Sequence, residues 1–291
     1  MLHLCLVLMS IMAADDTHSG NSGPTLRVVT YNIHGFGPVA AHDSGRVALR
    51  RMMGRKQLIR RLALELSLYR PDVISVQEAH SEARTQELAR ALDMHMAYFP
   101  GGWKGKGWPE GISGAILSRF PIIEVEDCPR EAGSERPEKI FSRHFGRALI
   151  DVDGTTVAVY SAHLLPSWEN TTSIRLSEIG GIVRTLKGDR EAGRSVIVLG
   201  DMNHAPDTPE HRAWLEAGFI DSFAAKGKGT PLTCPSIAPR ERIDYVFVAG
   251  PLSSRLKECR VLYEGAFRVS ADDLSSYALS DHLPVLAIFG D

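Results

Sequence analysis

Short apolar runs alternate along the chain with polar connections and a few longer amphipathic stretches. The runs are rich in Val, Ile, Tyr and Phe, and several are apolar throughout, which is typical of strands buried on both faces. They predict strands at residues 26–32, 72–78, 114–120, 147–153, 156–164, 195–203, 242–248 and 284–289. Asp153 and Gly154 stand between two of these runs and predict a two-residue hairpin turn, because both tolerate positive φ angles.

Amphipathic stretches predict the helices. Apolar residues recur at helical spacing at residues 47–69, 81–92, 174–186 and 208–217. Ser81 is a predicted N-cap, and Thr208 followed by Pro209 fits an N-cap with proline at the first helical position. Strands and helices mixed in this way predict a single α/β (α+β) domain.

Composition excludes several classes of protein. The chain has 291 residues, of which 44% are hydrophobic and 23% charged, and its formal net charge is −2. Disordered chains have fewer apolar residues and a larger charge imbalance, and a membrane span needs an apolar run of about 18 residues, which is absent here. Nucleic-acid packaging proteins are strongly basic. Four cysteines without a CxxC pair indicate neither a disulfide framework nor a zinc ribbon.

The N-terminus differs in character from the rest of the chain. Residues 1–14 are mostly apolar and end in small residues, which predicts a signal peptide too short to span a bilayer. Residues 15–25 are rich in Ser, Gly, Asn and Asp and predict a flexible linker before a catalytic domain at 26–291. We therefore expect an exported protein, periplasmic or extracellular; the alternatives are a mis-set start codon or a buried first strand.

Polar side chains end the predicted strands. Carboxylate, amide and imidazole groups occur at or beside six strand ends, at Asn32, Glu78, His163, Asp201, Asn203, Asp244, Asp281 and His282. One such residue is usually a cap or a solvated edge. Strands that lie side by side bring their ends together, so the whole set predicts one acidic, imidazole-bearing pocket.

The residue types in this pocket favour one kind of chemistry. Glu, Asp and Asn oxygens are hard ligands that suit Mg²⁺ or Mn²⁺, and histidines beside carboxylates can hold or move protons. The chain has no HExxH, GxSxG, GxxxxGK[ST] or GxGxxG motif, which argues against zinc peptidases, acyl-enzyme hydrolases and nucleotide-dependent transferases. Metal-assisted attack of water on phosphorus fits these residues best.

Six short motifs carry a resemblance to a known family. They are TYNIHG (30–35), VQE (76–78), SAHL (161–164), GDMN (200–203), RIDYVF (242–247) and SDHLPV (280–285). In this order and rough spacing they resemble the signature of the endonuclease/exonuclease/phosphatase superfamily, over about residues 26 to 289. The resemblance implies a four-layer α/β sandwich, in which two mixed β-sheets lie face to face between helices.

The resemblance also implies ligands for the metal. Glu78 corresponds to the principal ligand of the ion, with Asn32 and Asp281 near it directly or through water. The implied cofactor is Mg²⁺, with Mn²⁺ as the alternative.

Roles for the other residues follow from the same resemblance. Asp201 would orient or deprotonate the attacking water, and Asn203 would hold the water or the phosphate. His282, aligned by Asp244, would contact the scissile phosphate or serve as a base. His163 would stabilise the phosphate or protonate the leaving oxygen.

Two regions bear on the substrate. The loop at 101–111 interleaves aromatic and basic residues that could stack a base or touch a lipid interface, namely Trp103, Lys104, Lys106 and Trp108. Arg119 would either contact a phosphate or fix its own loop. A basic stretch at 46–61 is interpreted as a solvated helix face, with a phosphate-binding stripe as the alternative. The remaining polar residues near turns are expected to be solvated: His80, His144, His204, Asp207 and His211.

These observations predict a metal-dependent phosphoesterase that hydrolyses a phosphodiester or phosphomonoester by in-line attack of an activated water. The expected partner is a phosphate ester, whether nucleic acid, phospholipid headgroup or small molecule, and the expected state is a monomer without a membrane span. Narrower alternatives are an exported nuclease and a sphingomyelinase-like lipid phosphodiesterase. A catalytically silent phosphate-binding module of the same fold is the alternative from a different class.

Overall fold

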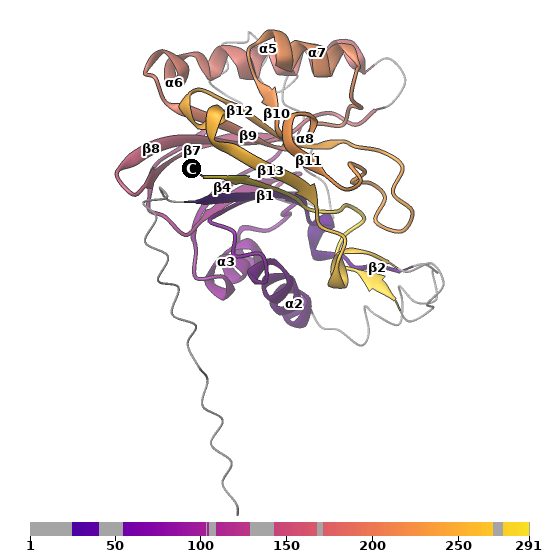
Figure 1. Cartoon of the computed structure of the whole chain (residues 1–291). Coiled ribbons are helices and arrows are strands. Elements are labelled where there is room, and N and C mark those ends of the chain that lie inside the picture. The colour runs from indigo at the N-terminus through magenta and orange to yellow at the C-terminus, as the bar shows by residue number, and fades with distance from the viewer. Residues whose placement is uncertain are drawn as a thin grey trace, which may run out of the picture.

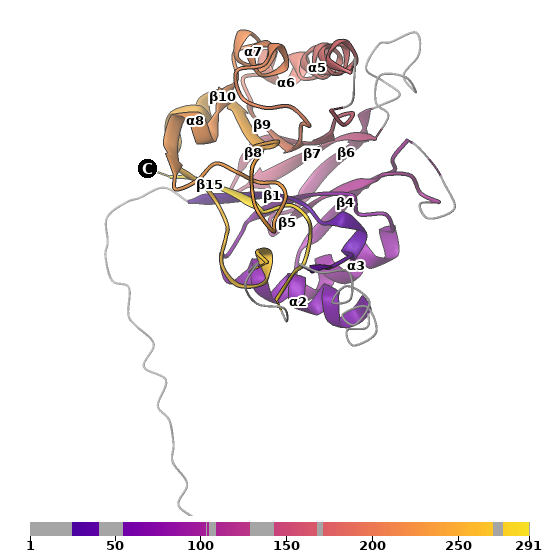
Figure 2. The same ribbon diagram turned by 90° about the vertical axis from the view of Figure 1, so that its right-hand side faces the viewer.

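Two mixed β-sheets pack face to face, and helices cover both outer faces (Figures 1 and 2). The computed structural model describes residues 25–40, 55–102, 104, 109–128, 143–167, 171–269 and 276–290. One sheet has seven strands in the order β11 (Gly227–Lys228), β13 (Leu256–Val261), β15 (Val285–Phe289), β1 (Leu26–Asn32), β3 (Val73–Gln77), β5 (Gly114–Ser118) and β4 (His95–Phe99). The other has six, in the order β10 (Ile220–Asp221), β12 (Asp244–Ala249), β9 (Ser195–Asp201), β8 (Thr155–His163), β7 (His144–Val152) and β6 (Ile122–Asp127).

Helices form the two outer layers. The seven-stranded sheet is covered by α2 (Arg55–Ser67) and α3 (Glu82–Ala91) (Figure 1). The six-stranded sheet is covered by α5 (Thr172–Thr185), α6 (Lys187–Glu191) and α7 (Pro209–Glu216). Smaller elements are α8 (Ser222–Lys226), the pair β2 (Val39–Ala40) and β14 (Tyr277–Ala278), and the 3₁₀ turns η1 (His34–Phe36), η3 (Pro251–Arg255) and η4 (Gly265–Phe267). The predicted four-layer α/β sandwich is therefore confirmed.

The period of two along a strand explains why the central strands are apolar throughout. In β9, Ile197 and Leu199 face the opposite sheet, whereas Val196 and Val198 pack with the buried side chains under the helices of the outer layer. Trp214 of α7 belongs to this second cluster, where its ring stacks on Phe247 at 5.0 Å. Because both faces of the strand are covered, no polar residue is needed until the strand ends.

All eight predicted strands are present, within a few residues at each end. The sequence prediction missed β4, β6 and β13, which have half-exposed positions and therefore carry polar residues. The strands β4 and β6 each form one of the two edges of their sheet. The hairpin at Asp153 and Gly154 is confirmed, with φ angles of 50° and 85°.

The predicted helix signals also hold. The side chains of Ser81 and Thr208 cap α3 and α7 by accepting hydrogen bonds from the backbone N–H of Arg84 and of His211, and Pro209 begins α7. Leu58, Leu62 and Leu66 of α2 are buried as expected, while Lys56, Arg60 and Arg61 lie on its exposed face. The part of the basic stretch before residue 55 lies outside the described residues. Among the described residues, no helix is long and apolar enough to cross a membrane.

Three of the histidines expected to be solvated are buried instead. His144, His204 and His211 all lie inside the fold, whereas Asp207 is exposed and His80 is half-buried. Each buried ring has a polar partner that the linear sequence does not reveal. His211 Nε2 lies 2.9 Å from a carboxylate oxygen of Asp221, and His204 Nδ1 lies 3.1 Å from the carbonyl oxygen of Ala205.

A chain of polar side chains joins the two sheets at the level of His144. His144 Nε2 lies 2.9 Å from Ser161 Oγ, which accepts a hydrogen bond from Ser75 Oγ across the interface at 2.8 Å. Gln77 then donates to Ser75 at 2.8 Å. Buried polar groups are costly unless all are paired, so this chain fixes how the sheets face one another. Gly114 leaves the space that His144 occupies, since a Cβ atom there would lie 2.0 Å from Nε2.

We expect Gly114→Ala to lower the free energy of unfolding by roughly 1–3 kcal/mol, the usual cost of overpacking a filled core. The added methyl would displace His144 or separate the sheets. Chemical denaturation measures the change.

The matched control is Gly188→Ala in α6, where a Cβ atom would have nothing within 4 Å. Because alanine favours helix more than glycine, this change should be neutral or stabilise by up to about 1 kcal/mol. If Gly114→Ala and Gly188→Ala unfold at the same denaturant concentration, the close approach does not constrain the fold.

Candidate active site

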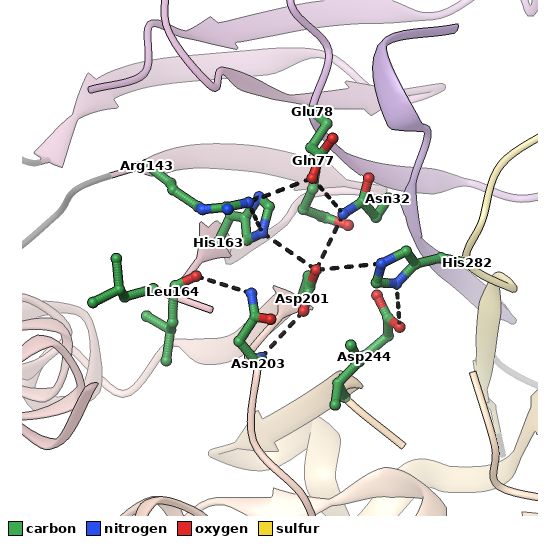
Figure 3. Close-up of polar contacts among 12 residues, drawn as sticks. Asn32, Gln77, Glu78, Arg143, His163, Leu164, Asp201, Asn203, Asp244 and His282 are labelled. Carbon is green, nitrogen blue, oxygen red and sulfur yellow. Dashed lines mark hydrogen bonds and ion pairs between the residues drawn. The ribbon is translucent and has the colours of Figure 1, made fainter. Parts of the chain in front are cut away.

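Strand register places three of the predicted site residues in one row with His144 across the six-stranded sheet. His144 on β7 pairs with His163 on β8, His163 with Asp201 on β9, and Asp201 with Asp244 on β12. In the facing sheet, Asn32 at the end of β1 pairs with Gln77 at the end of β3, and Glu78 follows. Figure 3 shows the side chains of Asn32, Glu78, His163, Asp201 and Asp244 converging on one another.

Asp201 lies at the centre of this group (Figure 3). Its Oδ2 accepts a hydrogen bond from Asn32 Nδ2 at 3.1 Å and lies 3.2 Å from His163 Nε2 and 3.7 Å from His282 Nε2. Its Oδ1 accepts from the backbone N–H of Asn203 at 3.1 Å. Burial raises the pKa of Asp201, but His163 and His282 outweigh it and hold the pKa well below its ordinary value. Asp201 is therefore ionised.

His282 and Asp244 form a buried ion pair. His282 Nδ1 lies 2.9 Å from Asp244 Oδ2. Burial alone would lower the pKa of His282, but Asp244 and then Asp201 raise it well above its ordinary value. For Asp244, burial raises the pKa, His282 lowers it and Asp201 raises it, with a result of about 6. At neutral pH the proton therefore stays on His282, as an imidazolium whose Nε2–H faces Asp201.

Arg143 joins the group from the residue just before β7. Its Nη1 lies 2.7 Å from His163 Nε2 and 3.4 Å from Glu78 Oε1. Burial, and then Arg143, lower the pKa of His163, so this histidine is neutral. A guanidinium can only donate, so His163 Nε2 either accepts from Arg143 or donates to Asp201, and the two contacts compete for one nitrogen.

The carboxylate of Glu78 is mostly buried at this site but remains partly accessible to solvent. Its side chain is 20% exposed, and its Oε1 accepts a hydrogen bond from Asn32 Nδ2 at 3.2 Å. Burial raises the pKa of Glu78, but His163, Arg143 and the hydrogen bond from Asn32 together lower it below the ordinary value. Glu78 has a φ angle of 55°. Left-handed backbone at non-glycine residues is strained and often marks functional sites.

The donor set fits a hard divalent cation. Glu78 and Asp201 present carboxylate oxygens on either side of Asn32, whose Nδ2 donates to both while its Oδ1 accepts from the backbone N–H of His34 at 3.1 Å. Carboxylate and amide oxygens of this kind bind Mg²⁺ or Mn²⁺. Ligand atoms of Asp201, Asp244 and His282 also lie within 4.8 Å of one another. The second set is the poorer one, because a ligating histidine must be neutral and His282 is held protonated.

The sequence matches the profile of the Endonuclease/Exonuclease/phosphatase family over residues 29–282. The chain belongs to this family. Its members hydrolyse phosphoric esters and generally use divalent metals, so the protein is a hydrolase that acts on ester bonds. A comparison with curated proteins finds no match.

Solved structures of the same fold agree with this assignment. An endonuclease/exonuclease/phosphatase family protein from Bacteroides thetaiotaomicron is 19% identical, with a TM-score of 0.66 over 92% of this chain and 98% of that one. The mannosyl-6-phosphatase of Bacteroides thetaiotaomicron VPI-5482 is 20% identical, with a TM-score of 0.64 and coverage of 90% and 98%. TDP2 of D. rerio in complex with a single-strand DNA product is 20% identical, with a TM-score of 0.61 and coverage of 91% and 98%.

Most of the predicted site residues meet at one rim of the sandwich. The residues in mutual contact are Asn32, Glu78, His163, Asp201, Asn203, Asp244 and His282. Asp281 stands at the margin with a side chain 40% exposed, where its Oδ1 is 3.3 Å from Ser280 Oγ and 3.9 Å from His34 Nδ1. Lys104 is exposed, and Trp103, Lys106 and Trp108 lie outside the described residues.

Arg119 is not part of this site, so the expectation that it contacts substrate phosphate here is wrong. It follows β5, whose last residue, Ser118, pairs with the first residue of β3, Val73. The site lies at the other end of β3, where Gly114 pairs with Gln77. Arg119 therefore lies at the opposite edge of the sheet, where its Nη2 is 2.6 Å from Asp72 Oδ1.

The sequence reasoning missed Arg143 because it began the fourth predicted strand at residue 147, three residues after the true start of β7 at His144. In an antiparallel pair, the residue before the start of one strand lies beside the end of the other. Recognising that β7 begins opposite His163 would have placed Arg143 at the site.

We expect Asp244→Asn to lower the pKa of His282, because Asp244 is the foremost group that opposes the effect of burial. The raised pKa stabilises the folded state fully below about pH 6.5, the ordinary histidine pKa, and this stabilisation is lost as the pH rises through the folded pKa. Removing the negative charge of Asp244 should make the free energy of unfolding depend less on pH in that range. Titration of the imidazole NMR signals and denaturation at several pH values measure both effects.

Asp207→Asn is the matched control, because Asp207 is exposed and its φ angle of 64° is one that asparagine tolerates. It should leave the titration of His282 unchanged. An unaltered His282 pKa in Asp244→Asn would show that the ion pair does not set the protonation of this histidine.

Proposed function

We propose that the protein is a Mg²⁺-dependent phosphoesterase in which water attacks phosphorus in line with the leaving oxygen. The observation that carries this proposal is the geometry around Asp201. Its carboxylate lies within hydrogen-bonding or ion-pair distance of Asn32, His163 and His282, beside the partly exposed carboxylate of Glu78. One rim of the sandwich then holds both a group that can orient water and groups that can donate hydrogen bonds to phosphoryl oxygens. In-line phosphoryl transfer requires chiefly such positioning and charge stabilisation.

Asp201 orients the attacking water as a hydrogen-bond acceptor that stays ionised. The backbone N–H of Asn203 fixes one oxygen of this carboxylate, and Asn32 fixes the other. Asn203 is itself held by the hydrogen bond from its Nδ2 to the carbonyl oxygen of Leu164, at 3.0 Å. A carboxylate held by several donors loses little entropy when it engages water.

His282 supplies positive charge and acts as a donor to a phosphoryl oxygen. The sequence left open whether His282 contacts the phosphate or acts as a base; its raised pKa supports the first role. Arg143 supplies a second positive charge from the opposite side, next to His163 and Glu78. When the phosphate draws Arg143 from His163, the imidazole becomes free to donate to Asp201 or toward the leaving oxygen.

Glu78 would hold the divalent cation, with Asn32 beside it and Asp281 at the margin. A bound Mg²⁺ would neutralise charge on the phosphoryl oxygens as it develops. The oxygen-only donors favour Mg²⁺, and Mn²⁺ can substitute for it.

Glu78→Gln tests the metal requirement. We expect it to lower kcat/KM by at least about 100-fold, the usual effect of losing one group that stabilises charge in the transition state, and to weaken Mg²⁺ binding measured by calorimetry. EDTA should abolish activity of the parent protein. Arg143→Gln should lower activity while Mg²⁺ still binds, because Arg143 meets the phosphate and not the cation.

Activity is to be assayed on plasmid DNA, RNA, sphingomyelin vesicles, inositol phosphates and simple phosphomonoesters. Glu216→Gln, on the exposed face of α7, is the control variant. Equal turnover with EDTA and in Glu78→Gln would refute the metal mechanism. No turnover on any phosphoester would favour a silent phosphate-binding module. Turnover of DNA or sphingomyelin alone would identify the narrower nuclease or lipid alternative.

We also propose that the protein is exported, on the basis of the apolar stretch at residues 1–14 and the polar linker after it. The expected result is a mature chain that begins near residue 15 in the secreted fraction. N-terminal sequencing of the expressed protein tests this, and an intact Met1 in the cell fraction alone would contradict export.

A further inference from the structure

Three arginines converge at the edge of the seven-stranded sheet opposite the active site. Arg27 comes from the start of β1, Arg70 from the turn after α2, and Arg119 from the turn after β5. Together with Thr25, Pro71 and Asp72 they line a pocket of about 350 Å³. This volume lies at the lower end of the range for small-molecule sites.

Asp72 holds together the segments that line this arginine pocket. Its carboxylate is nearly buried, with Oδ2 accepting from the backbone N–H of Arg27 at 2.8 Å and Oδ1 from Arg119 Nη2 at 2.6 Å. Its backbone N–H donates to the carbonyl oxygen of Arg27, and its carbonyl oxygen accepts from the N–H of Arg119, both at 2.8 Å. Asp72 therefore ties together two of the segments that carry the arginines.

The positive charge of the pocket exceeds what Asp72 can neutralise. Three arginines and one carboxylate line the pocket, and only the guanidinium of Arg119 is paired with Asp72 among the described residues. Among the described residues, the guanidinium of Arg27 makes one hydrogen bond, from Nη1 to the carbonyl oxygen of Tyr69 at 3.2 Å. Within the described part of the chain, the guanidinium of Arg70 has no hydrogen bond or ion pair, and that of Arg119 lies 4.8 Å from the ring centre of Phe120 with its side chain 60% exposed.

We propose that this pocket binds a phosphate-type dianion at a site separate from the catalytic centre. Two uncompensated positive charges match such an anion, and the planar fork of arginine donates to phosphate oxygens in pairs. Asp72 and Glu78 stand before and after β3, about 20 Å apart at 3.3 Å per residue, so one phosphate cannot reach both sites. The inference does not depend on the proposed function, because no catalytic group takes part.

Titration calorimetry with inorganic phosphate and with pyrophosphate, at low salt and with EDTA, tests the proposal. Arg70→Asn is the main variant, because Arg70 has a φ angle of 50°, which asparagine tolerates, and its side chain supports no contact of the fold described here. Arg27→Gln is the second variant. We expect each to weaken pyrophosphate binding about tenfold or more, since a charge-assisted hydrogen bond is worth at least that factor.

Two controls separate this pocket from other basic groups. Arg143→Gln removes an arginine of the active site and should leave one equivalent of pyrophosphate bound. Lys187→Gln, on the exposed surface of α6, should leave the affinity unchanged. Equal affinity in Arg70→Asn, Arg27→Gln and the parent protein would place the anion elsewhere. No binding of phosphate or pyrophosphate by the parent protein would show that the arginines serve only the internal ion pair with Asp72.

Discussion

The buried carboxylate of Asp201 is the constraint on which the active site depends. An ionised carboxylate away from water is costly unless hydrogen bonds and opposite charges surround it. Here Asn32, His163 and His282 come from three different segments to meet it, and Asn203 turns back to fix its second oxygen. Both sheets contribute, because β9 carries the acid while β1 carries Asn32. The stability of the rim and its chemistry therefore rest on the same contacts.

Charge balance around Asp201 assigns different states to two histidines of the same type. His282 lies between two carboxylates, which outweigh its burial and keep the proton on the ring. His163 lies equally buried but against Arg143, so burial and a like charge favour the neutral ring. This division leaves one cationic donor and one neutral imidazole at the same rim, and phosphoryl transfer can use both. The polar chain through Ser75 and Ser161 keeps the two sheets in the register that this balance requires.

The two ends of the seven-stranded sheet have opposite electrostatic character. At the carboxyl ends of β1 and β3 lie the acids that suit a cation, with Glu78 as the open member. At the amino ends of the same strands lie Arg27 and Arg70, with Arg119 after the antiparallel β5. The near-neutral net charge of the whole chain is thus the sum of separate regions of opposite sign, and each suits a ligand of the opposite charge.

The sequence by itself determined the fold class, the central strands and most members of the site. Strands such as β9, covered on both faces, are apolar until they end, so the polar residue that ends each one is visible in the linear pattern. The half-exposed strands β4 and β6 lack that contrast and were missed. Only the tertiary structure decided which end of the sheet received Arg119, that Arg143 joins Glu78, and which histidines are buried. Strand direction and register between distant segments set those contacts, and neither is encoded in local residue spacing.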